Sequence, residues 1–311
     1  MSTPRLIVHI GLHKTGTTFM QEQLFPRIAR SDARLVYNPP EVLGRLRAIY
    51  SQMHRGNYPD DDQIGDFRRH LEESVERAGR DDRRVLISLE RISQSLRRQN
   101  HSEHFDFFRK AVPAAVVVVV LRHQLQWIRS CYRQFIAGGA LAEFDELFGT
   151  GLKDGREYLF DLARVDYPGL VANYIDHCGR DHVEVFFYEK VFRDPPAFEQ
   201  ALGRVLGGCP IPKIDYSARA NPGLSGRSIR MLVRVARLGG YRFETGQLRR
   251  RMRYMRYVLY LLRRLDRWLP PGKDPIGWAR LDDAWAGVFR AQNQRLDALL
   301  GGGVVPPEYL E

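Results

Sequence analysis

Short apolar runs alternate with longer amphipathic stretches along most of the chain. Each run is rich in branched side chains and too short for a helix, so each predicts a buried β-strand. The four runs are PRLIVHI (residues 4–10), RRVLISLE (83–90), AAVVVVVLR (114–122) and HVEVFFYEKV (182–191). The run at 114–122 gives the clearest signal, because valine fills most of it.

The amphipathic stretches between these runs predict helices, because their apolar residues recur every three or four positions. The predicted helices cover residues 17–31, 61–79, 124–137 and 196–207. Residues 39–65 are rich in Pro, Gly and Asp and predict loop with one short helix. Strands that alternate with helices predict an α/β fold with a doubly wound parallel sheet of four or five strands and helices on both faces.

The bulk composition suits one large soluble domain over residues 1–311, because 44% of the 311 residues are apolar and 27% are charged. The longest uncharged apolar run, residues 114–121, is far shorter than the ~20 residues of a membrane helix. The first strand begins almost at once, which argues against a signal peptide. Cys131, Cys178 and Cys209 are scattered, without metal-ligand spacing. We therefore expect a cytoplasmic protein without disulfides.

The positive charge is concentrated in one segment of the predicted helical C-terminal region, which covers about residues 225–300. Residues 227–267 contain thirteen arginines and two acids, which accounts for the whole net charge of +11. Within it, RRRMRYMRYVLYLLRRLDRW (249–268) has apolar residues at helical spacing between its arginines. This pattern fits an anionic membrane surface, an acidic glycan, or an ordinary helix with snorkelling arginines. Nucleic acid is disfavoured, because no nucleic-acid-binding motif accompanies the patch.

The sequence GLHKTGTTFM, residues 11–20, follows the first predicted strand and has the composition of a phosphate-binding loop. Gly11 and Gly16 permit a tight turn and a close approach to an anion. The backbone amides of residues 15–18 begin a helix, and Thr15, Thr17 and Thr18 add hydroxyl groups. The lysine is displaced, however: the Walker A loop places it after the second glycine, whereas Lys14 precedes Gly16.

A second anion site is predicted where the third strand ends. Arg122 follows the apolar run directly, and Ser130 lies eight residues later in the next helix. An arginine at a strand end can contact a phosphate through two parallel hydrogen bonds. A serine two turns into the following helix can donate a further bond to the same group. The two sites together suit a nucleotide with phosphates at both ends.

These two segments resemble those of sulfotransferases. KTGTT after a strand is similar to their 5′-phosphosulfate-binding pattern K-[ST]-G-T-T, and VVVVVLRHQLQWIRSCY resembles their 3′-phosphate-binding segment. The segment HIGLHKTGTTFMQ is especially similar to the corresponding segment in bacterial members of the family. The chain departs from the common eukaryotic form after Arg122, where His123 and Gln124 replace an acid or asparagine and a proline.

The resemblance implies a P-loop-NTPase-like fold and the donor 3′-phosphoadenosine 5′-phosphosulfate (PAPS). In such an enzyme the sulfuryl group moves in line to a hydroxyl acceptor, or less commonly an amine, of unknown identity. Lys14 would stabilise the charge that develops on the bridging oxygen of the leaving nucleotide. A sulfuryl group carries less charge than a terminal phosphoryl group, so we expect no metal. The sequence contains no dedicated set of metal ligands.

The acceptor must also lose a proton, which requires a general base near the sulfur. Glu90 ends the second predicted strand, at the same sheet edge as Lys14 and Arg122, and is the first candidate. His13, beside Lys14 in the loop, is the second; related enzymes use either residue type. In the non-catalytic alternative, Glu90 only forms an ion pair with Arg91 or Lys14. Ser88 and Ser93 flank Glu90 and are further candidates for ligand contacts.

A later segment, ARANPGLSGRS, resembles an N-P-x-L-S stretch in bacterial relatives. Asn221 and Ser225 are therefore candidates for ordering a lid. The alternative is an Asn-Pro turn followed by a serine that caps the next helix.

Two other functions of the protein stay open. One is a nucleotide-dependent kinase, against which the displaced Lys14 argues. The other is a non-catalytic relative that binds a membrane or polyanion.

Overall fold

The protein is described here by a computed structural model that covers residues 4–96, 99–153, 156–217, 224–238, 262, 264 and 278–311. The chain divides into two compact units. The sheet unit comprises Met1–His123, Asp166–Ala220 and Gln292–Glu311, and the second unit comprises Gln124–Val165 and Asn221–Ala291. The expectation of one domain over the whole chain stays a prediction.

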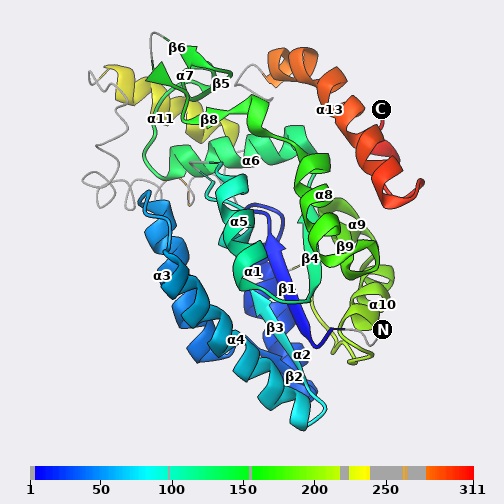
Figure 1. Ribbon diagram of the computed structural model, residues 1–311. Helices are drawn as coiled ribbons and strands as arrows, with labels where there is room; N and C mark the ends of the chain where they lie inside the picture. The colour runs from blue at the N-terminus through cyan, green and yellow to red at the C-terminus, as the bar shows by residue number, and fades with distance from the viewer. Residues whose placement is uncertain are drawn as a thin grey trace. The chain divides into compact units, whose positions relative to one another are not determined.

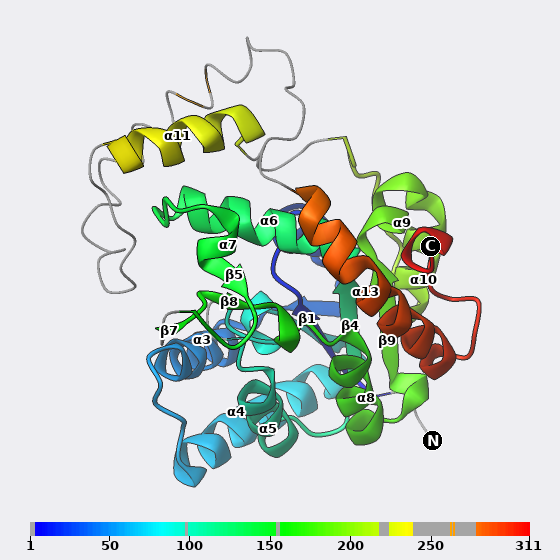
Figure 2. The ribbon, with the colours of Figure 1, turned by 90° about the horizontal axis from the view of Figure 1, so that it is seen from above.

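The sheet unit contains five parallel strands in the order β2-β3-β1-β4-β9, which confirms the predicted sheet. Figures 1 and 2 show β1, β4 and β9 side by side. Every residue of the central strands β1 and β4 is buried, which explains why their sequences are apolar apart from His9. The strands are β1 (Leu6–Gly11), β2 (Leu35–Tyr37), β3 (Arg84–Ser88), β4 (Val116–Leu121) and β9 (Val183–Phe187).

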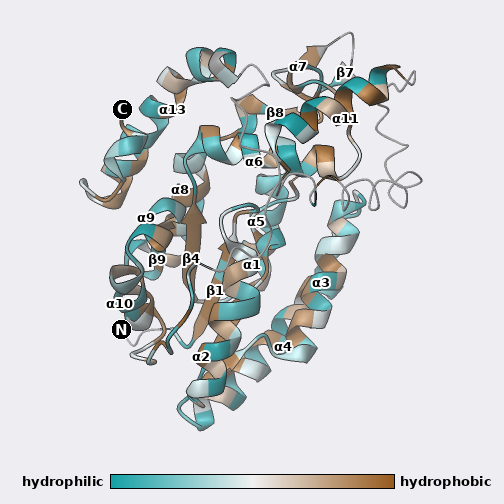
Figure 3. Cartoon of the chain, turned by 180° about the vertical axis from the view of Figure 1, so that it is seen from behind, coloured by the Kyte–Doolittle hydropathy of each residue, from teal (hydrophilic) through white to brown (hydrophobic). Residues whose placement is uncertain are grey.

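Helices cover both faces of this sheet, as predicted. On one face, apolar side chains from β1, β3, β4 and β9 pack against the segments after β1 and β9 in a single buried cluster. On the other face, α4 contacts β3, and α8 contacts β4 and β9. Figures 1 and 3 view the sheet unit from opposite sides, and β1 and β4 are brown, or hydrophobic, in Figure 3.

The helices of the sheet unit follow the strands in alternation. They are α1 (Thr17–Phe19), the π-helical turn η1 (Met20–Leu24), α2 (Phe25–Ser31), α3 (Pro40–His54), α4 (Asp61–Arg80), α5 (His101–Ala111), α8 (Tyr167–Cys178), α9 (Tyr188–Arg193) and α10 (Pro195–Val205). Short 3-10 turns are η2 (Glu90–Ile92), η4 (Arg180–His182) and η5 (Pro307–Tyr309). The predicted helices at 17–31, 61–79 and 196–207 are therefore confirmed.

Two sequence predictions are wrong in extent. Residues 40–54 form the full-length helix α3 rather than a loop with a short helix, because Val42, Leu46 and Tyr50 bury one face of it. The fourth predicted strand ends at Phe187, and α9 begins at Tyr188. Val191 belongs to that helix and is buried from it.

The second unit is built around aromatic side chains. The rings of Phe148 and Phe160 stack at 4.7 Å between centroids, and those of Tyr132 and Trp278 meet edge to face at 5.7 Å. Its elements are α6 (Gln124–Ala137), which was predicted, α7 (Phe144–Leu147), β5 (Phe148–Gly149), β6 (Leu152–Lys153), β7 (Arg156–Glu157), β8 (Phe160–Asp161), η3 (Leu162–Arg164) and α11 (Gly226–Leu238). Helix α13 (Trp278–Leu300) begins in this unit and ends in the sheet unit.

Neither a membrane helix nor a disulfide is found in the part of the chain that the structure describes. No described helix is long and apolar enough to cross a bilayer. All three cysteines are free thiols, and two of them, Cys131 and Cys209, are buried.

Candidate active site

The predicted site residues of the sheet unit follow the carboxyl ends of its parallel strands. Lys14 comes after β1, Glu90 after β3 and Arg122 after β4. The carboxyl ends of parallel strands share one edge of a sheet, where ligands of doubly wound folds bind.

The loop after β1, residues 11–18 and here called the glycine loop, is held in a tight conformation. Gly11 and Gly16 have positive φ angles of 95° and 85°, which favour glycine. A Cβ atom on Gly11 would also lie 3.0 Å from the Cα atom of Glu90. Lys14 adopts φ 66°, a conformation that costs a non-glycine residue about 1–2 kcal/mol. The buried Thr15 hydroxyl donates to the carbonyl of Leu12 at 2.7 Å and closes the turn.

The glycine loop leads directly into a helix start that suits an anion. Gly16 is the N-cap of α1 and brings no side chain to cap its first N–H groups. Thr17 is buried and Thr18 is half-buried at the first two helical positions. Free N–H groups at such a start can donate to a phosphate or sulfate.

Glu90 is tied to the glycine loop by two contacts. Thr17 donates its hydroxyl proton to Oε2 of Glu90 at 2.8 Å, and His13 Nδ1 lies 3.2 Å from Oε1. The carboxylate is therefore paired with His13 and Thr17, and no pairing with Arg91 is seen among the described residues. Burial alone would raise the pKa of Glu90, but the hydrogen bonds and charge of His13, the Thr17 hydroxyl and the Lys14 charge lower that pKa to about 2.

His13 touches two hydrogen-bond acceptors. Its Nδ1 faces Glu90, and its Nε2 lies 3.1 Å from the carbonyl oxygen of Gln94. A carbonyl oxygen and an ionised carboxylate can only accept hydrogen bonds, so both ring nitrogens of His13 face acceptors. The two candidate bases are thus in direct contact, here called the Glu90–His13 pair, and do not form two separate sites.

Arg122 reaches back from β4 toward the glycine loop. Its Nη1 donates to the carbonyl of Lys14 at 3.3 Å, and its guanidinium lies 4.5 Å from the centre of the Tyr188 ring. Its Nε is buried and has no hydrogen-bond partner among the described residues. A buried guanidinium nitrogen of this kind is a donor that an anionic ligand can satisfy.

Tyr188 is a site residue that the sequence interpretation missed. It is the first residue after β9, so it shares the edge with the other strand ends. Its ring packs under Arg122 and also against Gly16, whose missing Cβ would lie 3.4 Å from it. The available signal was its place at the strand end, but the predicted strand ran on to Val191 and placed Tyr188 inside it.

Other predicted residues are not brought to this edge by the described contacts. Ser130 lies in α6, which belongs to the second unit, so its meeting with Arg122 stays a prediction. Asn221 lies outside the described residues. Ser225 accepts a hydrogen bond from the backbone N–H of Ser228 at 3.2 Å, which confirms the helix-cap alternative. Its role in a lid stays a prediction.

The two serines beside Glu90 are occupied within the protein. Ser88 is 2.7 Å from Nδ1 of the fully buried His9 and accepts a second bond from Gln21. Ser93 is buried and donates to the carbonyl of Glu90 at 3.2 Å. Both serines therefore support the site from within, and their contact with a ligand stays a prediction.

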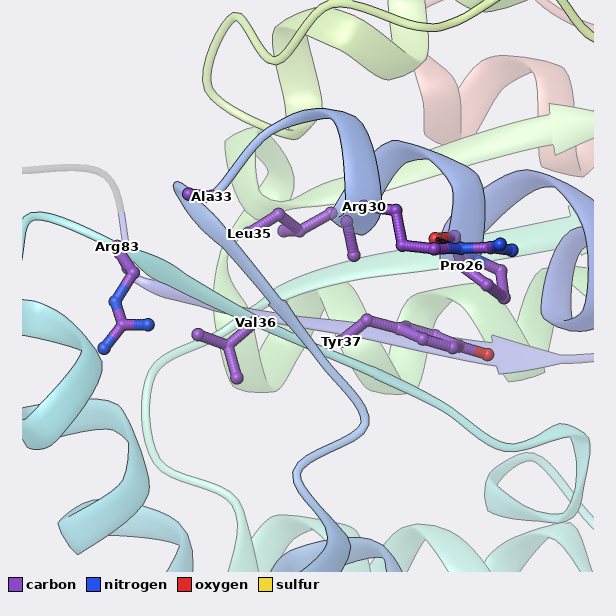
Figure 4. Close-up of a pocket in the computed structure, with 8 residues that line it drawn as sticks. Pro26, Arg30, Ala33, Leu35, Val36, Tyr37 and Arg83 are labelled. Carbon is purple, nitrogen blue, oxygen red and sulfur yellow. Dashed lines mark hydrogen bonds between the residues drawn. The ribbon is translucent and has the colours of Figure 1, made fainter.

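Neither a metal cluster nor the described pocket coincides with this edge. No group of three or more His, Cys, Asp or Glu that could hold a metal ion occurs among the described residues. An open pocket between α2 and β2 contains no predicted site residue (Figure 4). Its lining residues are Pro26, Ala29, Arg30, Ala33, Leu35, Val36, Tyr37 and Arg83.

No family model and no curated protein matches this chain. Two solved structures are similar at low sequence identity. A sulfotransferase from Alicyclobacillus acidocaldarius is 16% identical, with 80% of this chain and 100% of that chain covered and a TM-score of 0.43. The sulfotransferase domain of the Synechococcus PCC 7002 olefin synthase is 12% identical, with 92% and 96% covered and a TM-score of 0.38. TM-scores this low do not support an assignment of function, which therefore rests on the chemistry of the site.

Proposed function

We propose that this protein is a sulfotransferase that moves a sulfuryl group from PAPS to a hydroxyl acceptor. The observation that carries the proposal is the pairing of Glu90 with His13 and Thr17, which joins a candidate base to the same loop that presents Lys14. In-line transfer from a nucleotide requires a base and a cation for the leaving group close together, and Glu90 contacts the loop that contains Lys14.

The residues present fit such a donor. Lys14, Gly16 and the N–H groups that begin α1 would hold the 5′-phosphosulfate. Arg122, with its unsatisfied buried Nε, would hold the 3′-phosphate, joined by Ser130. Bound PAPS supplies the sulfuryl group, and the chain binds it, orients it and handles the proton.

During transfer the acceptor oxygen forms a bond to sulfur while the bond from sulfur to the bridging oxygen breaks. Lys14 stabilises the negative charge that forms on that bridging oxygen. The acceptor's proton passes to the Glu90–His13 pair. Glu90 alone, with its pKa lowered to about 2, is a weak base while His13 donates to it. We therefore propose that the acceptor hydroxyl replaces His13 Nδ1 at Oε1 of Glu90, where the carboxylate can take its proton.

The direct test is sulfuryl transfer from labelled PAPS in a screen of acceptor extracts. A labelled product that forms with wild-type protein and not with Lys14→Ala protein supports the proposal. Absence of transfer across all extracts, together with phosphoryl transfer from ATP, would replace it with the kinase alternative. No observation in the described structure favours that alternative.

We also propose an anionic partner for the basic C-terminal region. The segment first considered, residues 249–268, lies almost wholly outside the described residues. Helix α11 belongs to the same basic stretch, and its described residues support this proposal. Met231, Val235 and Leu238 are 50%, 61% and 89% exposed, and Arg227 and Arg234 are exposed beside them. Apolar side chains next to arginines are typical of a helix that lies on an anionic membrane surface.

This partner is consistent with a cytoplasmic protein that binds the inner membrane face peripherally, which is part of the proposal. An acidic glycan would use the arginines but leave the three apolar side chains in water. For that reason the lipid surface is preferred to the glycan. A non-catalytic relative that only binds membranes would show vesicle binding without turnover of PAPS.

A further inference from the structure

The end of the chain contacts the segment that carries Arg122. Tyr309, in the 3-10 turn η5 (Pro307–Tyr309), is buried, and its hydroxyl donates to Oε2 of Glu189. The other oxygen of Glu189 accepts from the backbone N–H of His123 at 3.2 Å. The rings of His123 and Tyr309 also meet edge to face at 5.0 Å. Figure 2 shows the chain terminus beside α9, the helix that contains Glu189.

The turn η5 is itself firmly held within the sheet unit. The fully buried Asn293 donates to the carbonyl of Tyr309 at 2.8 Å. The carboxylate of Asp297 accepts from three successive backbone N–H groups, at residues 303–305. Arg193 pairs with Glu308 at 2.9 Å. These contacts fix the position of Tyr309, so its hydroxyl is held in place next to Glu189.

Glu189 links the two segments that build the Arg122 side of the site. It is bonded to His123, the neighbour of Arg122, and it follows Tyr188, whose ring lies under the guanidinium. Burial and the Glu189 carboxylate raise the pKa of Tyr309, so its phenol keeps its proton and donates to that carboxylate. Without that donor, Glu189 has one described partner left and can turn away from His123.

We propose that Tyr309 is a positioning residue for the 3′-phosphate site, acting through Glu189 and His123 to fix Arg122. This inference rests on the proposed function, because it needs Arg122 to read the 3′-phosphate. His123, the neighbour of Arg122, is held by its backbone N–H to Glu189 and by its ring to Tyr309.

The test is Tyr309→Phe, which removes only the hydroxyl and keeps the ring that packs on His123 and Phe187. Isothermal titration measures binding of phosphoadenosine phosphate, the desulfated product, and of adenosine 5′-phosphate, which lacks the 3′-phosphate. We expect phosphoadenosine phosphate to bind about tenfold more weakly, the size of one lost hydrogen bond to a charged group. Adenosine 5′-phosphate should bind as it does to wild type.

The matched control is Tyr132→Phe, which removes another buried tyrosine hydroxyl, one that donates to the carbonyl of Ala142 in the second unit. Both variants lose a buried hydrogen bond, and thermal unfolding measures that shared loss. Only Tyr309→Phe should change the ratio of the two nucleotide affinities. Glu189→Gln, which removes the charge that Tyr309 contacts, should change the ratio in the same direction.

The outcomes distinguish the role of Tyr309 from the proposed function. If wild type prefers phosphoadenosine phosphate and Tyr309→Phe keeps the same ratio, the positioning role is overturned while the proposed function stands. Equal loss of both nucleotides in Tyr309→Phe assigns Tyr309 a purely structural role and overturns it as well. If wild type shows no preference for the 3′-phosphorylated nucleotide, the assignment of Arg122 fails, and the role of Tyr309 fails with it.

Discussion

The glycine loop and the Arg122 corner, defined as Arg122, His123, Tyr188, Glu189 and Tyr309, are built in opposite ways. The glycine loop takes its shape from consecutive residues: two glycines with positive φ angles and a threonine that bonds three residues back. The Arg122 corner is assembled from three distant parts of the sheet unit. A site formed by consecutive residues can be recognised from a sequence motif. In a site formed by residues distant in sequence, only single residues such as Arg122 can be recognised.

The largest predicted effect concerns the base attached to the glycine loop. Glu90→Gln keeps the size of the side chain but cannot take a proton, so turnover should fall by about 10²–10⁴. Binding of phosphoadenosine phosphate should stay near that of wild type. Glu72→Gln, at a glutamate of α4 paired with Arg68, is the matched control and should leave turnover unchanged.

The same variant decides between the two members of the Glu90–His13 pair. If Glu90→Gln keeps near-normal turnover while His13→Ala is inactive with intact donor binding, His13 is the base. The pH profile gives a second criterion. A pKa lowered to about 2 keeps Glu90 ionised across the acid range, so loss of activity in the ordinary range of histidine would point to His13.

The next effect concerns Lys14, the cation of the glycine loop. Lys14→Ala should lower turnover by about 10²–10³, the usual cost of removing a donor that stabilises developing charge. Binding of phosphoadenosine phosphate should weaken much less, because the lysine acts mainly on charge formed during transfer. Equal losses in turnover and binding would make Lys14 only a binding residue. Lys110→Ala, at a lysine of α5 paired with Asp106, serves as the control.

The Arg122 corner is tested by Arg122→Ala. We expect phosphoadenosine phosphate to bind about tenfold to a hundredfold more weakly, because a charge-assisted bond contributes roughly 1.5–3 kcal/mol. A nucleotide without the 3′-phosphate should lose little. Similar losses for both nucleotides would show that the corner does not read the 3′-phosphate, and the contrast between the two regions would then disappear.

A smaller effect concerns α11, outside both regions. Arg227→Gln combined with Arg234→Gln should weaken sedimentation with vesicles that contain phosphatidylserine by about tenfold, since each cation contributes roughly 1 kcal/mol or less. Met231→Ser should weaken it further. Leu152→Ser, at another exposed leucine of the second unit, is the matched control. Binding of the arginine variant at the wild-type level would remove α11 from the proposed membrane surface.

The smallest effect is on stability in acid. The pKa of Glu90 is lowered in the folded protein, so its ionised form stabilises the fold at pH values above its unfolded pKa. That contribution is lost as the pH falls toward about 2. The difference in unfolding free energy between wild type and Glu90→Gln should therefore shrink between pH 5 and pH 2. A difference that is constant over this range would contradict the lowered pKa.

The sequence predicted the parts of the fold that depend on local patterns. Strands β1, β3 and β4 are short, mainly apolar runs, and the apolar residues of α4 and α6 recur at helical spacing, so their positions followed directly. Strand β2 could not be predicted, because three residues that only pair with β3 leave no periodic signal. Helix α3 was underestimated because Pro40 and Gly44 suggested loop, whereas Pro suits the first position of a helix.

For the site, too, the sequence predicted the residues of local motifs but not the contacts between distant segments. His13 and Glu90 were weighed as competing bases, and only tertiary structure places them 3.2 Å apart. Tyr188 was hidden inside the predicted strand HVEVFFYEKV, which ends at Phe187 in the structure. The contact of Tyr309 with Glu189 joins residues 120 positions apart. No pattern within one segment encodes such a contact.

The most direct test of the central claim is isothermal titration of the wild-type protein with phosphoadenosine phosphate and, separately, with ATP and magnesium. This measurement needs no knowledge of the acceptor. A glycine loop whose lysine precedes its second glycine, with an arginine at the end of β4, should bind phosphoadenosine phosphate without added metal and at least tenfold more tightly than magnesium–ATP, a margin of about 1.4 kcal/mol. Tighter binding of magnesium–ATP, or no binding of phosphoadenosine phosphate, would contradict the assignment of this site to a sulfotransferase.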